Sequence, residues 1–284
     1  MTSPSPAPEA KRIFPKTTGI MALFRYRQPL SVLVRRDLAV KYQSTTMGYF
    51  WSMIEPLGLA LIFWFIFGVV FGREGDLPPG VGYPIYIVSG IFAWQWFSSA
   101  VNEGSKSLTG QSRLITVMKV PREIFPVGKV FARFADYAMG FPILVGVAIL
   151  FGGTFGWNML WLIPALITQA IMLTGMAFIV SAINVLYRDV QRFLTLFTRL
   201  LFYSSPIIYP ISRVTEALQE HTWVLYAYLA NPMVGLFLMH RAAWIPELTP
   251  SWWQITSTVT FSVVLLFFGR WIFHRVEPKV LKAL

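Results

Sequence analysis

The amino-acid sequence predicts an all-α membrane protein with six transmembrane helices. It also predicts an N-terminal amphipathic interface helix and external re-entrant helices between spans five and six. Of the 284 residues, 55% are hydrophobic and only 13% are charged, whereas ordinary soluble domains carry about 25% charged residues. Several apolar runs reach the length of about 20 residues that crosses a bilayer core. Lys and Arg gather in alternate loops between these runs, which is typical of cytoplasmic loops.

Six segments are predicted to span the membrane, and loops with prolines, glycines or charges separate them. They form one transmembrane domain over 47–273, with spans at 47–72, 83–103, 129–152, 158–186, 193–211 and 252–273. Both termini are predicted to be cytoplasmic, because this orientation leaves only three basic residues outside, Arg73, Arg213 and Arg241. Five spans would instead place one basic terminus outside.

The termini are predicted to lie outside the lipid. Residues 1–18 are rich in Ser, Pro, Ala, Lys and Arg, which predicts a disordered cytoplasmic tail and no cleavable signal peptide. Residues 274–284 form a second, basic cytoplasmic tail.

Residues 19–46 are predicted to form a helix on the membrane surface. One face is apolar, and the basic residues favour an anionic leaflet of membrane lipid; the apolar face comprises Leu30, Leu33, Val34 and Leu38. Asp37 is expected to pair with Lys41 one turn further on. The helix is either a simple anchor or a lever beside a partner subunit.

Composition excludes several kinds of chemistry. The chain has no cysteine, and its three histidines lie too far apart to predict a metal site. No GxxxxGK[ST] phosphate loop occurs, so we expect no catalytic residue and no cofactor in this chain, and any ATP-driven work needs another polypeptide. The net charge of +11 is spread between apolar runs instead of forming one stripe, so no nucleic-acid partner is expected.

Glu55 is the one charged residue between Met47 and Gly72. Eight residues at 1.5 Å place it roughly 12 Å along the first span. A carboxylate that faces lipid centrally costs about 2.5–3.5 kcal/mol, so Glu55 is expected to face water, a polar path or a partner. It either lines a translocation path or caps or pairs near the inner interface, and Pro56 is expected to bend the helix there.

Two further charges lie at the inner end of the third span. Arg133 and Asp136 are spaced i, i+3 and are expected to form a structural ion pair on one helix face. Glu103, which closes the second span at the same level, is an alternative partner for Arg133.

Aromatic side chains are abundant in the first and fifth spans. An interfacial belt explains many such rings; the alternative is a path whose rings stack on passing sugars. With Glu55, the candidate path residues are Tyr49, Phe50, Trp51, Phe197, Phe202, Tyr203 and Tyr209.

Two connecting segments are more than simple loops. Residues 212–250 hold two apolar pieces that are too short to span but long enough to dip in from outside, as an external lid or a plain surface cap. Residues 104–128 hold a short amphipathic element flanked by prolines, which favours docking in a groove of a partner. Its candidate contact residues are Leu114, Val117, Met118, Arg122 and Glu123.

Three motifs resemble those of the ABC-2 type permeases of polysaccharide exporters, which carry O-antigen, teichoic acid, capsule or galactan. Tyr187-Arg188-Asp189 follows the fourth span, and Ser205 to Tyr209 with Asn231-Pro232 resembles the region around and after the fifth. Met47 stands where the family usually has leucine. The likeness before the first span is carried by Arg36, Asp37, Tyr42, Ser44, Gly48, Trp51 and Pro56.

The resemblance implies a homodimer of six-span subunits joined to two ABC ATPase subunits, which bind ATP and magnesium. It implies that residues 104–128 couple to the ATPase and that a polyprenyl-diphosphate-linked glycan moves outward across a bacterial inner membrane. By analogy, the diphosphate meets basic residues on the cytoplasmic side. The candidates are Arg35, Arg36 and Lys41.

No motif in the sequence specifies which of the family's cargoes this chain carries. The Ser/Pro/Ala-rich tail and the frequent Ala, Val, Arg and Gly are typical of a high-GC actinobacterium, and for such a source the resemblance implies cell-wall galactan as the cargo. Drug or lipid exporters share the architecture and form the main alternative. An ion channel, which would conduct without an ATPase, and a membrane scaffold, which would transport nothing, are more distant alternatives.

Overall fold

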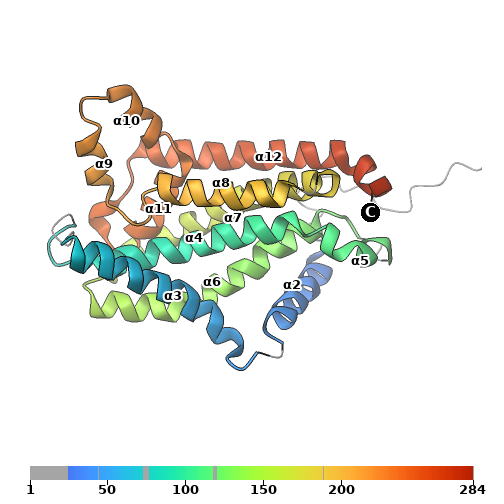
Figure 1. Cartoon of the computed structure of the whole chain (residues 1–284), viewed down its shortest axis with the longest axis horizontal. Helices are drawn as coiled ribbons and strands as arrows, with labels where there is room; N and C mark the ends of the chain where they lie inside the picture. The colour runs from blue at the N-terminus through green and yellow to red at the C-terminus, as the bar shows by residue number, and fades with distance from the viewer. Residues whose placement is uncertain (1–24, 44, 73–76, 118–119, 188, 284) are drawn as a thin grey trace, which may run out of the picture.

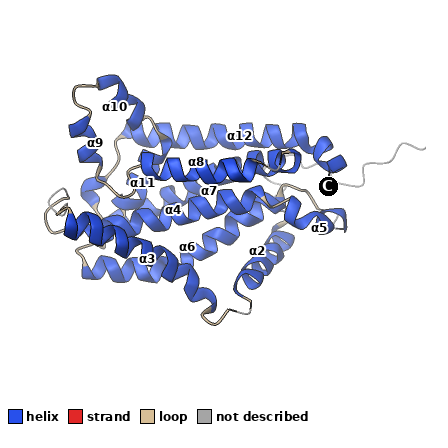
Figure 2. Cartoon of the chain, viewed as in Figure 1, coloured by secondary structure: helices blue, strands red, loops and turns tan. Residues whose placement is uncertain are grey.

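A computed structural model describes residues 25–43, 45–72, 77–117, 120–187 and 189–283. Within these ranges all regular structure is helical, as Figure 2 shows, so the all-α prediction is confirmed. The long helices run side by side along one axis (Figure 1). At one end lie α2, α5 and the C-terminal turns of α12, and we call this the basic end; α9 and α10 lie at the other.

The helices follow the predicted segments closely. Their bounds are α2 (Arg27–Tyr42), α3 (Trp51–Phe63), α4 (Tyr83–Ser105), α5 (Ser112–Val117), α6 (Ile124–Leu150), α7 (Leu162–Leu186), α8 (Val190–Ser204), α9 (Ile211–Ala217), α10 (Thr222–Leu229), α11 (Pro232–Ala242) and α12 (Trp252–Ala283). A 3-10 turn (Gly48–Phe50) leads into α3, and a π-helical segment (Trp64–Val70) extends it. The predicted tail at 1–18 lies outside the described residues.

Four helical stretches in the described chain are long and apolar enough to cross a membrane. They are Gly48–Val70, Ile124–Leu150, Trp157–Leu186 and Trp252–Pro278, and they make the protein a multi-pass membrane protein. The bent pair α10 and α11, with an angle of 62°, raises the number to five if it counts as one span.

The predicted second and fifth spans are helices that do not meet this test, so six spans remain a prediction. The fifteen residues of α8 reach roughly 22 Å, which is short of the hydrocarbon core of about 30 Å. Helix α4 is long enough but less apolar, and other helices surround it, since every residue from Tyr83 to Trp94 is buried.

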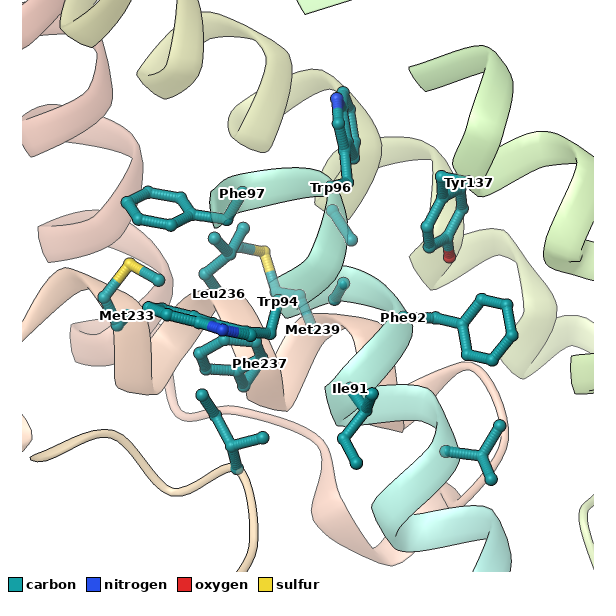
Figure 3. Packing of buried hydrophobic residues seen from close by; sticks show 14 of the residues in the cluster. Ile91, Phe92, Trp94, Trp96, Phe97, Tyr137, Met233, Leu236, Phe237 and Met239 are labelled. Atoms are coloured by element: carbon teal, nitrogen blue, oxygen red, sulfur yellow. The ribbon is translucent and has the colours of Figure 1, made fainter. Parts of the chain in front are cut away.

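The core forms where α4 packs against its neighbours. Ile91, Trp94 and Phe97 of α4 lie beside side chains of α11 (Figure 3). The α11 residues in this cluster are Met233, Leu236, Phe237 and Met239. Helix α11 is buried along its whole described surface from Met233 to Ala242, so the second half of the predicted lid is a core element.

Helices α7 and α12 approach each other at glycines. A Cβ on Gly269 would overlap the carbonyl oxygen of Gly175, and one on Gly175 would lie 2.6 Å from the carbonyl carbon of Leu265. Small residues of this kind let two helix backbones touch in a membrane. The contact fixes where α12 lies, and with it the charged residues near its C-terminal end.

Replacing Gly269 with Ala should therefore lower the melting temperature of the detergent-solubilised protein, because one methyl group must push the two backbones apart. Overpacking of this kind costs about 1–3 kcal/mol. The matched control is Gly146→Ala in α6, where nothing lies within 4 Å of the new methyl group. Equal melting temperatures for the two variants would contradict the close-contact interpretation.

Candidate functional site

At the basic end, the carboxylate of Asp136 in α6 joins α2 to the bundle. It lies 2.8 Å from the Lys41 Nζ and 2.7 Å from the Arg133 Nη1, and it accepts a 2.7 Å hydrogen bond from the Tyr42 hydroxyl. Arg133 is almost fully buried. The predicted pair of Arg133 and Asp136 is confirmed, and the same carboxylate also holds the C-terminal turn of α2.

A second ion pair fixes the middle of α2. Asp37 lies 2.8 Å from the Lys129 Nζ of α6 and 3.2 Å from the Arg36 guanidinium. The expected pair of Asp37 and Lys41 is therefore wrong, because α6 supplies a closer cation for Asp37 and a carboxylate for Lys41. Glu103 also binds Lys129, at 3.4 Å, and not Arg133.

Tyr42 is buried at the junction of α2 and α3. Burial raises the pKa of its phenol, and the hydrogen bond to Asp136 raises it further, so Tyr42 remains a neutral donor. Its ring also packs on Tyr49, with centroids 4.6 Å apart. Helix α2 is thus held by charges, a phenol and ring packing.

The three basic residues proposed to meet a diphosphate differ in their surroundings. Lys41 is neutralised by Asp136, and Arg36 binds Asp37. Arg35 lies exposed on α2. Of the three, Arg35 is the one that forms no ion pair with another described residue.

Beside this junction the protein is hollowed by an open pocket. Its empty volume is about 350 Å³, a figure that includes space open to solvent. The pocket is lined from α2, α3, α4 and α6, by Lys41, Ser52, Glu55, Pro56, Phe92, Gln95, Trp96, Ser99, Arg133, Asp136 and Tyr137. Glu55 thus faces a polar hollow, and no described residue forms an ion pair or a hydrogen bond with it.

The predicted aromatic path residues fall into two groups. Tyr49, Phe50 and Trp51 are exposed at the start of α3, near Glu55. The others lie on or just after α8: Phe197 packs on Phe193, Phe202 contacts Phe63, Trp94 and Tyr203, and the Tyr209 hydroxyl donates to the carbonyl of Tyr203.

The predicted coupling residues Arg122 and Glu123 are buried and turn towards α12. Arg122 lies 2.6 Å from Glu277, while Glu123 lies 2.8 Å from Arg270 and 2.5 Å from His274. We call these five residues the α12 clasp. Leu114 packs against the nearby apolar cluster; Met118 and the side chain of Val117 lie outside the described residues.

A buried arginine side chain stabilises the non-helical segment that follows α8. Arg241 of α11 donates to the carbonyls of Pro206 and Ile207, the latter at 2.7 Å, and its guanidinium lies 3.6 Å from the centre of the Tyr86 ring. The Tyr83 hydroxyl donates to the carbonyl of Ile208. The positive-inside pattern placed Arg241 in an external loop, so sequence reasoning missed this role; its position in an apolar run was the available signal.

Fold and site together define a class. This is a multi-pass helical membrane protein in which the charged helix α2 is attached at one end of the bundle. The segment that follows α8, which prolines interrupt, packs within it against α11, the buried half of the bent helix pair. Arrangements of this kind, with irregular backbone buried inside the helical bundle, occur in membrane transporters.

The chain belongs to the ABC-2 type transporter family, whose pattern matches residues 28–238. It is 28% identical over 256 residues to the O-antigen export system permease protein RfbA of Klebsiella pneumoniae, covering 90% of this chain and 94% of that protein. It is 25% identical to RfbA of Myxococcus xanthus (90% and 95%) and 22% identical to the polysialic acid transport protein KpsM of Escherichia coli (89% and 95%).

Replacing Asp136 with Ala should destabilise the protein by about 2–4 kcal/mol, because Lys41 and the buried Arg133 would both lose their carboxylate. The control is Glu216→Ala, which breaks an exposed pair with Arg213 that is worth at most about 1 kcal/mol. Thermal unfolding in detergent measures both. A melting temperature for the Asp136 variant no lower than that of the control would show that the junction does not depend on this carboxylate.

Proposed function

We propose that this chain is the permease subunit of an exporter that carries a polyprenyl-diphosphate-linked polysaccharide from the cytoplasm to the outer face of a bacterial inner membrane. The carrying observation is the alignment with permeases named for O-antigen export over nine-tenths of this chain and nearly all of theirs. Within that cargo class, cell-wall galactan is our particular candidate.

In this proposal, separate subunits bind and hydrolyse the ATP that drives export. The sequence has no phosphate-binding loop of the GxxxxGK[ST] type, so two ABC ATPase subunits would bind ATP and magnesium at the cytoplasmic, basic end. Residues 104–128 are the part of the chain that we expect them to contact. The α12 clasp then passes their movement to α12, because Arg122 and Glu123 bind that helix directly.

A second copy of the chain is the partner that we propose for α8. This helix exposes apolar side chains together with Arg192 and Arg199; the apolar ones are Phe193, Leu196, Leu200 and Tyr203. An arginine at membrane depth is costly against lipid. A homodimer would cover the apolar side chains of α8 and let the arginines face a water-filled path between the two copies.

The alternative is a permease for a drug or another lipid. It shares the family and the architecture, and it differs from the proposed function only in cargo. Relatives named for O-antigen and polysialic acid favour a glycan.

Purification in mild detergent, followed by mass spectrometry of the retained proteins and lipids, tests the proposal. We expect an ABC ATPase subunit together with a polyprenyl diphosphate that bears a glycan. An ATPase without glycan would favour the drug or lipid alternative. Repeated preparations without any ATPase would contradict an ATP-driven exporter.

A charge exchange tests the α12 clasp. Glu123→Arg alone should slow ATP-driven export about tenfold or more, because a buried arginine would then face Arg270. Adding Arg270→Glu should restore part of the export, since the pair is rebuilt with its charges exchanged. Export in the reconstituted complex is the measurement, and the amount of bound ATPase controls for assembly. A single variant with full export would remove the clasp from coupling.

A further inference from the structure

Two exposed side chains of opposite charge have no counter-charge within the described chain. Glu55 lies on α3, in a stretch that is apolar enough to span the membrane, and Arg192 lies near the start of α8. Neither side chain forms an ion pair or a hydrogen bond with a described residue. The cations that line the pocket beside Glu55 are Lys41 and Arg133, and Asp136 binds both. Because charges in membrane-spanning helices pair with one another or face water, Glu55 and Arg192 each need water or a counter-charge from outside the chain.

These two charges lie at nearly the same depth. Helices α3 and α8 run away from the basic end on either side of α4 (Figure 1). The Phe63 ring of α3 contacts the Phe202 ring of α8, with centroids 5.7 Å apart, so these two residues share a level. At about 1.5 Å per residue, Glu55 lies about 12 Å from that level towards the basic end, and Arg192 lies about 15 Å from it. Arg199 lies only about 4.5 Å from it, so Glu55 is level with Arg192.

A second copy of the chain can neutralise both charges at once. Two copies in one membrane have the same orientation, so a two-fold axis between them runs along the membrane normal. Such an axis leaves the depth of every residue unchanged, and each contact across it forms twice. Two groups that are level within one chain can therefore meet across the interface. An anionic lipid headgroup, by contrast, would neutralise Arg192 but repel Glu55.

The next turn of each helix adds an apolar contact. Leu59 follows Glu55 by four positions, and Leu196 follows Arg192 by four positions, so each leucine lies on the same helix face as its charge. Both leucine side chains are exposed in the single chain. Each helix thus presents a charge nearer the basic end and a leucine one turn further on. The two faces are complementary, with opposite charges at one level and apolar side chains at the next.

We propose that α3 of one copy packs against α8 of the other, with Glu55 bound to the partner's Arg192 and Leu59 packed on the partner's Leu196. The proposal rests on the homodimer of the proposed function, and it specifies the surface through which that dimer forms. Arg199 does not take part in the ion pair and remains beside the path between the two copies.

Co-purification of two differently tagged full-length copies from one bacterial membrane tests the ion pair. Glu55→Arg in both copies should reduce co-purification about tenfold, because two arginines then face each other at each contact. Arg192→Glu in both copies should do the same with two carboxylates. Pairing one copy that carries Glu55→Arg with one that carries Arg192→Glu should restore most of the association. In that mixed dimer one contact has exchanged charges and the other is unchanged.

The matched control replaces the Arg192→Glu copy with an Arg199→Glu copy, which leaves one contact with two facing arginines. We expect no recovery in this control, and the amount of each variant in the membrane is measured alongside. Single variants that associate as well as the unaltered chain would overturn the proposal. Mixed copies that do not recover, or that recover equally with Arg199→Glu, would overturn it too.

Disulfide formation tests the apolar contact. The chain has no cysteine, so introduced thiols are the only ones. Leu59→Cys in one copy and Leu196→Cys in the other should give a disulfide-linked dimer on mild oxidation. Leu59→Cys with Val264→Cys is the control, because Val264 is equally exposed but lies on α12. A yield for the first pair no higher than for the control would contradict the proposed surface.

The unaltered chain separates this proposal from the one on which it rests. If two tagged copies of the unaltered chain do not co-purify, the homodimer of the proposed function fails. If they co-purify, but the mixed charge variants do not recover and Leu59→Cys does not link to Leu196→Cys, the homodimer stands and this interface is wrong.

Discussion

The structure depends on one constraint, which is that no buried backbone polar group can be left without a partner. The two prolines after α8 interrupt the helix, and the buried carbonyl groups between Pro206 and Tyr209 have no partner within a helix. Arg241, Tyr83 and Tyr86 satisfy these carbonyls from α11 and α4. The irregular segment therefore requires a buried cation, and the cation in turn requires α11 to lie deep in the bundle against α4. Gly90 makes room, since a Cβ there would lie 2.7 Å from the Arg241 guanidinium.

At the basic end, ion pairs between side chains hold the helices together. Asp136 and Asp37 connect α2 to α6, while the α12 clasp connects the segment before α6 to α12. Both networks meet at the start of α6, so α2, the proposed coupling segment and α12 are all attached at the same place. A force applied to residues 104–128 would reach α2 and α12 through paired charges instead of through flexible loops. This arrangement favours a lever over a simple anchor for α2.

Several features of the fold and site could be predicted from local pattern. Apolar runs, prolines and glycines marked nearly every helix, because a helix in lipid needs a continuous apolar sequence. The pair of Arg133 and Asp136 followed from helical spacing alone. The partners of Asp37, Glu103, Arg122 and Glu123 could not be predicted in this way. Each is bonded to a residue on another helix, and sequence spacing contains no information about which helix that is.

The sequence by itself determined the class of the protein, because hydrophobic length and the distribution of Lys and Arg are properties of the chain. It also determined where the helix after the fourth span must break, because proline cannot donate a backbone hydrogen bond. Only the tertiary structure decided that Arg241 is a core residue and not an external one. It also decided that Glu55 shares a pocket with Gln95, Ser99 and Tyr137. The physical reason is that these groups come from different helices, and packing alone sets their distances.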